Sequence, residues 1–207
     1  MPDFTYENEA RAAGYATVCG VDEAGRGPLC GPVYAAAVIL PESCVIPGLN
    51  DSKKLSAKKR EALFPVIREK AVAYAVAWVD EKEIDATDIL SASMKAMQLA
   101  IDGLAIQADF ALIDGNRDHG RTSAITTPHE CIVKGDSLSL SIAAASVLAK
   151  VSRDRFVVEV LDRQYPQYRF AKHKGYGTKL HREMYDQYGP CPAHRMTFLK
   201  KWQGGEN

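Results

Sequence analysis

Four carboxylate side chains occupy positions where metal and phosphate chemistry commonly takes place in α/β proteins. Asp22 and Glu23 end a strand-like run just before a glycine-rich turn, and Asp114 ends a second such run. Asp136 stands at the expected N-cap of a long helix. Ligands gather at the carboxyl ends of strands and at the adjoining helix starts of α/β sheets. An all-oxygen site of this kind suits Mg²⁺ or Mn²⁺, so the sequence predicts a divalent-cation site.

Each of these carboxylates also has a simpler structural explanation. Acidic residues form turns at strand ends and cap helices, and N-capping alone accounts for Asp136. Neighbouring residues on a regular strand point to opposite faces, so Asp22 and Glu23 reach one cation only if the backbone bends. Gly25 and Gly27 permit such a bend. Both interpretations therefore stay open on the sequence pattern alone.

Two segments near these acids are candidates for contact with phosphate or sugar. Gly25-Arg26-Gly27, called the 25–27 turn below, lets the backbone approach a ligand closely, although it also fits an ordinary tight turn. Residues 52–60 hold five basic side chains, including Lys53, and this run equally fits a solvated helix face. Neither segment is specific by itself.

The C-terminal part of the chain carries a further basic segment. Residues 169–182 contain no acid and interleave aromatic side chains with basic ones, including Lys174 and Tyr176. Such a loop can hold a nucleic-acid backbone and stack on a base or sugar, and a solvated basic tail is the competing interpretation. His194-Arg195 either contacts phosphate or simply ends the domain.

Composition and missing motifs exclude several classes of protein. The 207 residues fit one domain with an appendage, and equal numbers of basic and acidic residues exclude a uniformly basic surface. No apolar run approaches about 18 residues, and the acidic, polar start lacks a signal-peptide pattern. The five scattered cysteines form no CxxC pair, which favours a reducing cytoplasm over disulfides or structural zinc. No HExxH, GxSxG, Walker A or GxGxxG motif is present.

The elements that position these residues follow from hydrophobic periodicity. Two leading strands are expected to form a hairpin, and the later alternation of helices and strands indicates an α/β domain with a mixed sheet. Pro65 is expected to kink or split its helix. The expected strands cover residues 16–22, 33–40, 71–80, 110–114 and 131–133, and the expected helices cover 56–70, 87–106, 140–161 and 179–188.

Taken together, the motifs are similar to those of a known family. The chain resembles bacterial ribonuclease HII, the type 2 ribonuclease H, with the motifs in the family's order over nearly the whole chain. Each motif is modest alone, and the set is highly specific. The matching segments are Val21-Asp-Glu-Ala-Gly-Arg-Gly-Pro28, Asp51-Ser-Lys-Lys-Leu-Ser56, Leu112-Ile-Asp-Gly-Asn116, Lys134-Gly-Asp136, Ser141-Ile-Ala-Ala-Ala-Ser146, Ala149-Lys-Val-Ser-Arg-Asp154, His173-Lys-Gly-Tyr-Gly-Thr-Lys179 and Gly189-Pro-Cys-Pro-Ala-His-Arg195.

The resemblance implies a fold and an activity. The fold is α/β, with a ribonuclease H-like mixed five-stranded sheet flanked by helices and a helical C-terminal extension. Residues 1–165 would form the catalytic domain and residues 166–207 the substrate-binding extension. The activity is endonucleolytic hydrolysis of RNA in RNA–DNA hybrids and cleavage 5′ of single ribonucleotides in duplex DNA, leaving 3′-hydroxyl and 5′-phosphate ends. We expect a cytoplasmic monomer that binds these nucleic acids and no membrane.

The resemblance also implies roles for single residues. Two Mg²⁺ or Mn²⁺ ions per active site would be held by the catalytic carboxylates Asp22, Glu23, Asp114 and Asp136. The 25–27 turn corresponds to a loop that reads the ribose 2′-hydroxyl, and Tyr176 to a tyrosine that stacks on the sugar at the RNA-to-DNA junction. The remaining residues expected to bind substrate are Lys53, Lys174, His194 and Arg195.

Two alternatives and one departure accompany the resemblance. A Holliday-junction resolvase or integrase core would share the acidic cluster but cut DNA without a 2′-hydroxyl. A non-catalytic nucleic-acid-binding module would use the basic tail and tolerate loss of the carboxylates. The segment between Asp114 and Lys134 is a few residues longer than is typical of the family, which leaves its path open. That segment carries Arg117, Asp118, His119 and Arg121.

Overall fold

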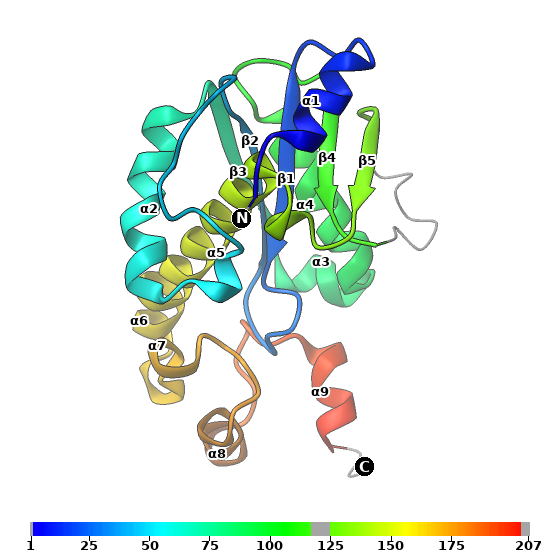
Figure 1. Ribbon diagram of the computed structural model, residues 1–207. Coiled ribbons are helices and arrows are strands. Elements are labelled where there is room, and N and C mark those ends of the chain that lie inside the picture. The colour runs from blue at the N-terminus through cyan, green and yellow to red at the C-terminus, as the bar shows by residue number, and fades with distance from the viewer. Residues whose placement is uncertain (1, 117–124, 204–207) are drawn as a thin grey trace.

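A single mixed sheet forms the centre of the protein, and helices cover both of its faces (Figure 1). The computed structural model describes residues 2–116 and 125–203. The strand order is β3-β2-β1-β4-β5. β2 runs antiparallel to both of its neighbours, β1 and β3. β4 runs parallel to both of its neighbours, β1 and β5. The strands are β1 (Val18–Ala24), β2 (Val33–Ile39), β3 (Ala73–Val79), β4 (Phe110–Asp114) and β5 (His129–Ile132).

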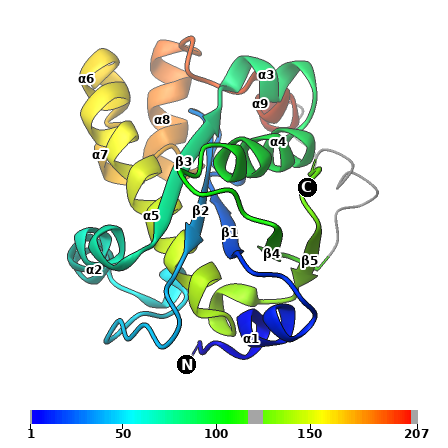
Figure 2. The ribbon, with the colours of Figure 1, turned by 90° about the horizontal axis from the view of Figure 1, so that it is seen from above.

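The helices form a layer on each side of this sheet. Figure 2 shows α3, α4 and α9 on one side and α1, α2 and α5 on the other. The helices are α1 (Thr5–Ala12), α2 (Ala57–Lys70), α3 (Glu81–Ala86), α4 (Ile89–Asp102), α5 (Leu140–Phe156), α6 (Asp162–Gln164), α7 (Phe170–His173), α8 (Lys179–Tyr188) and α9 (Met196–Gln203). The expected sheet flanked by helices, with a helical C-terminal region, is confirmed.

Strand alternation divides the interior into two cores. On β2, Ala35 and Ala37 pack toward α4, whereas Ala36 and Val38 pack toward α2 and α5. β2 is buried along its whole length because both of its faces are covered, as its continuous apolar run predicts. On β1, Val21 faces the α4 side. Its neighbour Asp22 therefore faces the α5 side.

α5 lies unusually close to β1, because small residues line the contact. A Cβ atom added to Gly20 would lie 2.2 Å from the backbone nitrogen of Ile142, so only glycine fits there. The alanines at 143–145 in the first turns of α5 are fully buried. This close packing fixes the start of α5 against the strand that carries Asp22.

The structure corrects four expectations about the elements. Helix α2 runs unbroken through Pro65, because that residue lies on the exposed face while Leu63 and Ile67 anchor the buried face. The helix expected over 87–106 starts at Ile89 after an Asp88 N-cap, and a separate helix, α3, precedes it. Helix α1 was not expected, and β5 begins earlier than its short apolar run indicates.

The C-terminal helices close a third, smaller core beside the turn that follows β1. Its buried residues come from that turn, from the π-helical turn Val157–Leu161 and from the C-terminal segments, and include Cys30, Tyr168 and Phe170. None of the described helices combines the length and apolar character needed to span a bilayer. The longer segment noted in the sequence falls partly outside the described residues, as do the four positions named for it, Arg117, Asp118, His119 and Arg121.

Candidate active site

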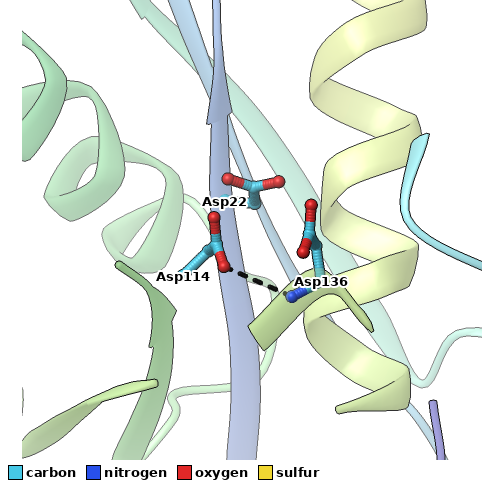
Figure 3. A group of neighbouring side chains, drawn as sticks. All are labelled: Asp22, Asp114 and Asp136. Carbon is cyan, nitrogen blue, oxygen red and sulfur yellow. Dashed lines mark hydrogen bonds between the residues drawn. The ribbon is translucent and has the colours of Figure 1, made fainter. Parts of the chain in front are cut away.

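Asp22, Asp114 and Asp136, called the acidic trio below, converge from three separate segments of the chain (Figure 3). Each offers one carboxylate oxygen, and these oxygens all lie within 4.8 Å of one another. β1 and β4 are parallel neighbours in which Val21 is paired with Ile113, so the next residues, Asp22 and Asp114, lie side by side. The register of the sheet therefore brings together two acids that are distant in sequence.

Asp136 enters the site from a short 3₁₀ turn, Gly135–Ser137, rather than from a helix N-cap. The turn is preceded by Lys134 in a left-handed conformation (φ 58°). The backbone N–H of Asp136 donates to Asp114 Oδ1 at 3.3 Å. Ser139 is the N-cap of α5, which corrects the expected capping role of Asp136. The side chain of Asp136 is thereby left available to the acidic trio.

Burial and the charges of neighbouring acids raise the pKa values of the acidic trio. Asp22 is 2% exposed, and its pKa is raised well above the usual range by burial and then by the charges of Glu23 and Asp114. Burial is also the main cause that raises the pKa of Asp114. The pKa of Asp136 rises to about 6 through burial and then through Asp114 and Asp51. The site thus concentrates negative charge that the fold only partly compensates.

Lys53 offsets part of the negative charge of the acidic trio. Its Nζ lies 3.6 Å from Asp136 Oδ2. Burial opposes the charge of this lysine, but Asp22, Asp136 and Asp114 outweigh it and raise the lysine pKa. One ammonium group beside several carboxylates leaves an excess of negative charge. Closely spaced carboxylate oxygens with no nitrogen or sulfur donor among them suit a hard divalent cation, so the residues present fit Mg²⁺ or Mn²⁺.

Glu23 lies beside the acidic trio but does not join it. β1 stays a regular strand through Ala24, so Glu23 and Asp22 point to opposite faces. The Glu23 side chain is 14% exposed, and its Oε1 accepts from Arg26 Nη1 at 3.3 Å. Its charge still raises the pKa values of Asp22 and Asp114. The structure therefore places Glu23 at the rim of the site, paired with the arginine of the 25–27 turn.

A pocket of about 320 Å³ connects Asp22 and Glu23 to the 25–27 turn. Tyr176, a residue that is 40% exposed, forms another wall. A Cβ atom on Gly27 would lie 3.8 Å from the ring, so the turn and the tyrosine are neighbours. The residues that line this pocket are Asp22, Glu23, Ala24, Gly25, Arg26, Gly27, Ser52, Lys53, Lys150 and Tyr176.

Sequence reasoning missed two residues at this site. Lys150 lines the pocket, and its Nζ lies 5.4 Å from the centre of the Tyr176 ring. It is the only lysine in the mainly apolar run of residues 140–151, and a single charged residue in such a run could have indicated a functional role. Asp51 is buried, and its carboxylate contributes to the raised pKa of Asp136. Its place directly before the lysine run was equally visible.

The structure places Lys174, His194 and Arg195, which are expected to bind substrate, outside the pocket that contains Asp22 and Tyr176. Lys174 lines a separate cleft between α2 and α5, and its ammonium group donates to the Ala171 carbonyl. His194 is 2% exposed, and its Nδ1 accepts from the Cys191 N–H at 2.9 Å. Arg195 is 0% exposed, and its guanidinium donates to four backbone carbonyls. These side chains do not line the pocket, because they hydrogen-bond to other groups of the chain.

Comparisons with known proteins agree with this geometry. A family model described as ribonuclease HII matches residues 19–201. The ribonuclease HII of Acetivibrio thermocellus is 52% identical over 95% of this chain and 75% of its own length. That of Caldicellulosiruptor bescii is 51% identical over 95% of this chain and 93% of its own length. The crystal structure of ribonuclease H2 from Pyrococcus horikoshii has a TM-score of 0.71 and 27% identity, and covers 91% of this chain and 96% of that chain.

The family model and these relatives span the sheet, the acidic trio and the C-terminal helices together. The resemblance noted in the sequence is thereby confirmed. The chain belongs to the ribonuclease HII family, the type 2 ribonucleases H that cleave RNA in RNA–DNA hybrids.

Proposed function

We propose that this protein cuts RNA–DNA hybrids and also cuts duplex DNA on the 5′ side of single embedded ribonucleotides, leaving 3′-hydroxyl and 5′-phosphate ends. The observation that carries this proposal is the shared pocket. Asp22 of the acidic trio lines one wall of this pocket together with Glu23, and the 25–27 turn and Tyr176 form the others. Asp114 and Asp136 lie directly beside Asp22. Phosphate chemistry and recognition of a sugar are therefore available within one cavity.

The acidic trio would hold the divalent cations, with Glu23 at the rim of the same site. When bound, two Mg²⁺ or Mn²⁺ ions supply an activated water and stabilise the charge that develops on the leaving oxygen. Asp22 and Asp114 are held on adjacent strands, so their carboxylates keep a fixed separation. Lys53 and Lys150 bring positive charge to the wall where a phosphate would lie.

Selection of a ribonucleotide would come from the 25–27 turn. Backbone amides and carbonyls can hydrogen-bond a 2′-hydroxyl without reading the base. A site built for that hydroxyl rejects an all-DNA strand, because its own polar groups would then lose their partner. Tyr176 is partly exposed, and its ring would stack on the sugar at the RNA-to-DNA junction.

The division of labour along the chain follows from this arrangement. Residues 1–165 would supply the catalytic sheet, and residues 166–207 would supply Tyr176 and the support behind it. Cleavage beside an embedded ribonucleotide is the step that would begin its excision from DNA. The proposed setting is the cytoplasm, and the proposed active form is a monomer.

A paired cleavage assay tests the function. Purified protein is incubated with Mg²⁺ or Mn²⁺ and an end-labelled duplex that contains one ribonucleotide, or with its all-DNA match. We expect one product, cut 5′ of the ribonucleotide, and no cleavage of the all-DNA duplex. Equal cleavage of both duplexes would favour a DNA nuclease of the same architecture. Salt-sensitive binding without any product would favour a binding module.

A further inference from the structure

The 25–27 turn is held from inside the protein by one buried side chain, Arg195. The guanidinium donates to four backbone carbonyls that lie 164 to 170 residues earlier in the chain. Nη2 donates to the Gly25 carbonyl at 2.6 Å, and Nη1 donates to the carbonyls of Arg26 at 3.1 Å and Pro28 at 2.9 Å. Nε donates to the Gly31 carbonyl at 2.9 Å.

We propose that Arg195 is a positioning residue for ribonucleotide selection: it fixes the 25–27 turn in the conformation that presents its amides to the 2′-hydroxyl. This inference rests on the proposed function. A fully buried side chain that does not line the pocket would thus contribute to substrate specificity. Arg195 acts through the turn and does not line the pocket itself.

The geometry of the peptide group links the guanidinium to the pocket. The protein contains no cis peptide bond in the described chain, and in a trans peptide the carbonyl and the following N–H point in opposite directions. Because the carbonyls of Gly25 and Arg26 point toward Arg195, the N–H groups of Arg26 and Gly27 point away from it. The 25–27 turn lines the pocket, and Arg195 lies on its other side.

These two amides are free to meet a ligand. Among residues 2–116 and 125–203, no group accepts a hydrogen bond from the N–H of Arg26 or Gly27. Other amides of the same loop are used within the fold, since Leu29 donates to Gly175 and Gly31 donates to Ala193. The loop is therefore tied down directly after the two donors, and strand β1 holds the chain before them through Ala24.

Local preferences do not fix this conformation alone. Gly25 has φ +106°, and a Cβ atom there would lie 3.0 Å from the Pro32 carbonyl oxygen. A glycine that adopts such a conformation is also free to leave it, because it populates many backbone states. The four bonds from Arg195 restrict that freedom. The planar, five-donor guanidinium can reach several carbonyls at once, whereas a lysine ammonium acts as a point donor.

The environment of Arg195 supports a dedicated role. None of the ion pairs among the described residues includes this arginine, so its direct partners are carbonyl dipoles, and the carboxylates of Glu81 and Asp85 act on its charge without contacting it. Phe198 lies against it, with the guanidinium carbon 5.2 Å from the ring centre. The Arg195 N–H donates to the Leu29 carbonyl at 2.9 Å, so backbone and side chain grip the same loop.

The test compares binding of two duplexes by Arg195→Lys and by the unchanged chain, both in an Asp22→Asn background so that substrate survives. Fluorescence anisotropy gives the dissociation constant for a duplex with one ribonucleotide and for its all-DNA match. We expect Arg195→Lys to reduce the preference for the ribonucleotide by about tenfold or more, since small displacements of a binding group have effects up to about 10²-fold. Affinity for the all-DNA duplex should stay the same.

Controls separate positioning from general loss of stability. Ile101→Val lowers stability in the core beside α4 without touching the turn, and should keep the full preference. If Arg195→Lys does not fold, Phe198→Leu keeps the guanidinium but removes its aromatic neighbour, and should reduce the preference by about twofold to fivefold. An unchanged preference in the folded variants, or a parallel loss of affinity for both duplexes, overturns the inference. Absence of any preference in the unchanged chain would instead overturn the proposed function.

Discussion

Two neighbouring regions are rich in buried polar groups: the acidic pocket, and the layer of arginine and histidine side chains behind the 25–27 turn. They differ in whether the chain itself supplies partners for those groups. At the acidic trio, burial and then the charges of neighbouring acids raise the pKa values of Asp22, Asp114 and Asp136, and Lys53 offsets only part of the negative charge. The fold holds this cluster together against repulsion, which a bound cation would relieve.

The layer behind the turn consists of Arg153, Arg195, His173, His181 and His194, and most of its polar atoms have partners within the chain. Nε2 of His173 hydrogen-bonds the Tyr168 carbonyl at 2.9 Å, Nδ1 of His181 bonds the Tyr176 carbonyl at 3.0 Å, and Arg195 bonds four carbonyls. Arg153 Nε is an exception, with no hydrogen-bond partner among the described residues. Buried polar groups that hydrogen-bond within the chain indicate a structural role. Buried like charges without enough opposite charge indicate a ligand site.

The comparison predicts its largest effect for loss of one charge from the acidic pocket. In Asp22→Asn, cleavage of the single-ribonucleotide duplex should fall by at least about 10³-fold, or about 4 kcal/mol in activation free energy. The free energy of unfolding without divalent cations should not fall, because the change removes a carboxylate that burial and neighbouring acids disfavour. Glu69→Gln, on the exposed face of α2, is the matched control. Full cleavage by Asp22→Asn would remove this residue from the site.

Divalent cations should stabilise the pocket but not the layer behind it. Saturating Mn²⁺ at about 100 times its dissociation constant should add about 2.7 kcal/mol to the free energy of unfolding. Asp22→Asn should lose most of this gain, whereas His181→Gln should keep it, because His181 lies in the other region. Urea unfolding with and without Mn²⁺ measures the gain, and EDTA should stop cleavage. Equal gains in all three proteins, or turnover in EDTA, would contradict a metal site at the acidic trio.

A third prediction concerns the surface where the two regions meet. Tyr176→Ala removes a stacking face worth about 1–3 kcal/mol. Cleavage at a single embedded ribonucleotide should fall by about tenfold, and cleavage of a long hybrid should fall less. Tyr176→Phe retains the ring and should retain the selectivity. The ratio of kcat/KM values on the two substrates is the measurement. Equal losses on both substrates would show that Tyr176 does not read the junction.

The smallest predicted effect is a difference in how the two regions respond to pH. Burial lowers the pKa values of His181 and His194 to about 4, below the 6.5 of an unperturbed histidine. The unfolded chain therefore binds more protons, and the stability from these neutral histidines is lost as pH falls from 6.5 toward 4. The pKa of Asp136 is raised to about 6, so its contribution has the opposite sign and is lost as pH rises from 3.8 through 6.

Single substitutions separate the histidine and Asp136 contributions to the pH dependence of stability. His181→Asn should reduce the slope of stability against pH between 4 and 6.5, by at most about 1.4 kcal/mol per pH unit for one proton. Asp136→Asn should make stability rise more steeply with pH over the same range. Urea unfolding in EDTA at several pH values gives both slopes. Identical slopes in the two variants would show that these groups do not differ between the folded and unfolded chains.

Much of the fold was predictable because its signals are local. Continuous apolar runs marked β2 and β4, alternation marked β3, and the acids at the strand ends marked the site. Helix α1 gave no such signal, because what holds it is distant. Its buried Glu7 accepts from the Ser139 hydroxyl at 2.7 Å and from the Ser141 N–H at 2.9 Å, more than 130 residues away. The unbroken α2 depended likewise on where Pro65 faces in the folded protein.

The sequence by itself determined which residues carry charge, which segments alternate or run apolar, and which motifs occur in what order. Only the tertiary structure decided what those charges meet. The parallel register of β1 and β4 placed Asp22 beside Asp114, and the path of the chain turned Arg195 inward to carbonyls 164 to 170 residues away. The same basic side chain can donate to a phosphate or to a backbone carbonyl. Its partner is set by burial and by contacts between distant segments, which no local pattern contains.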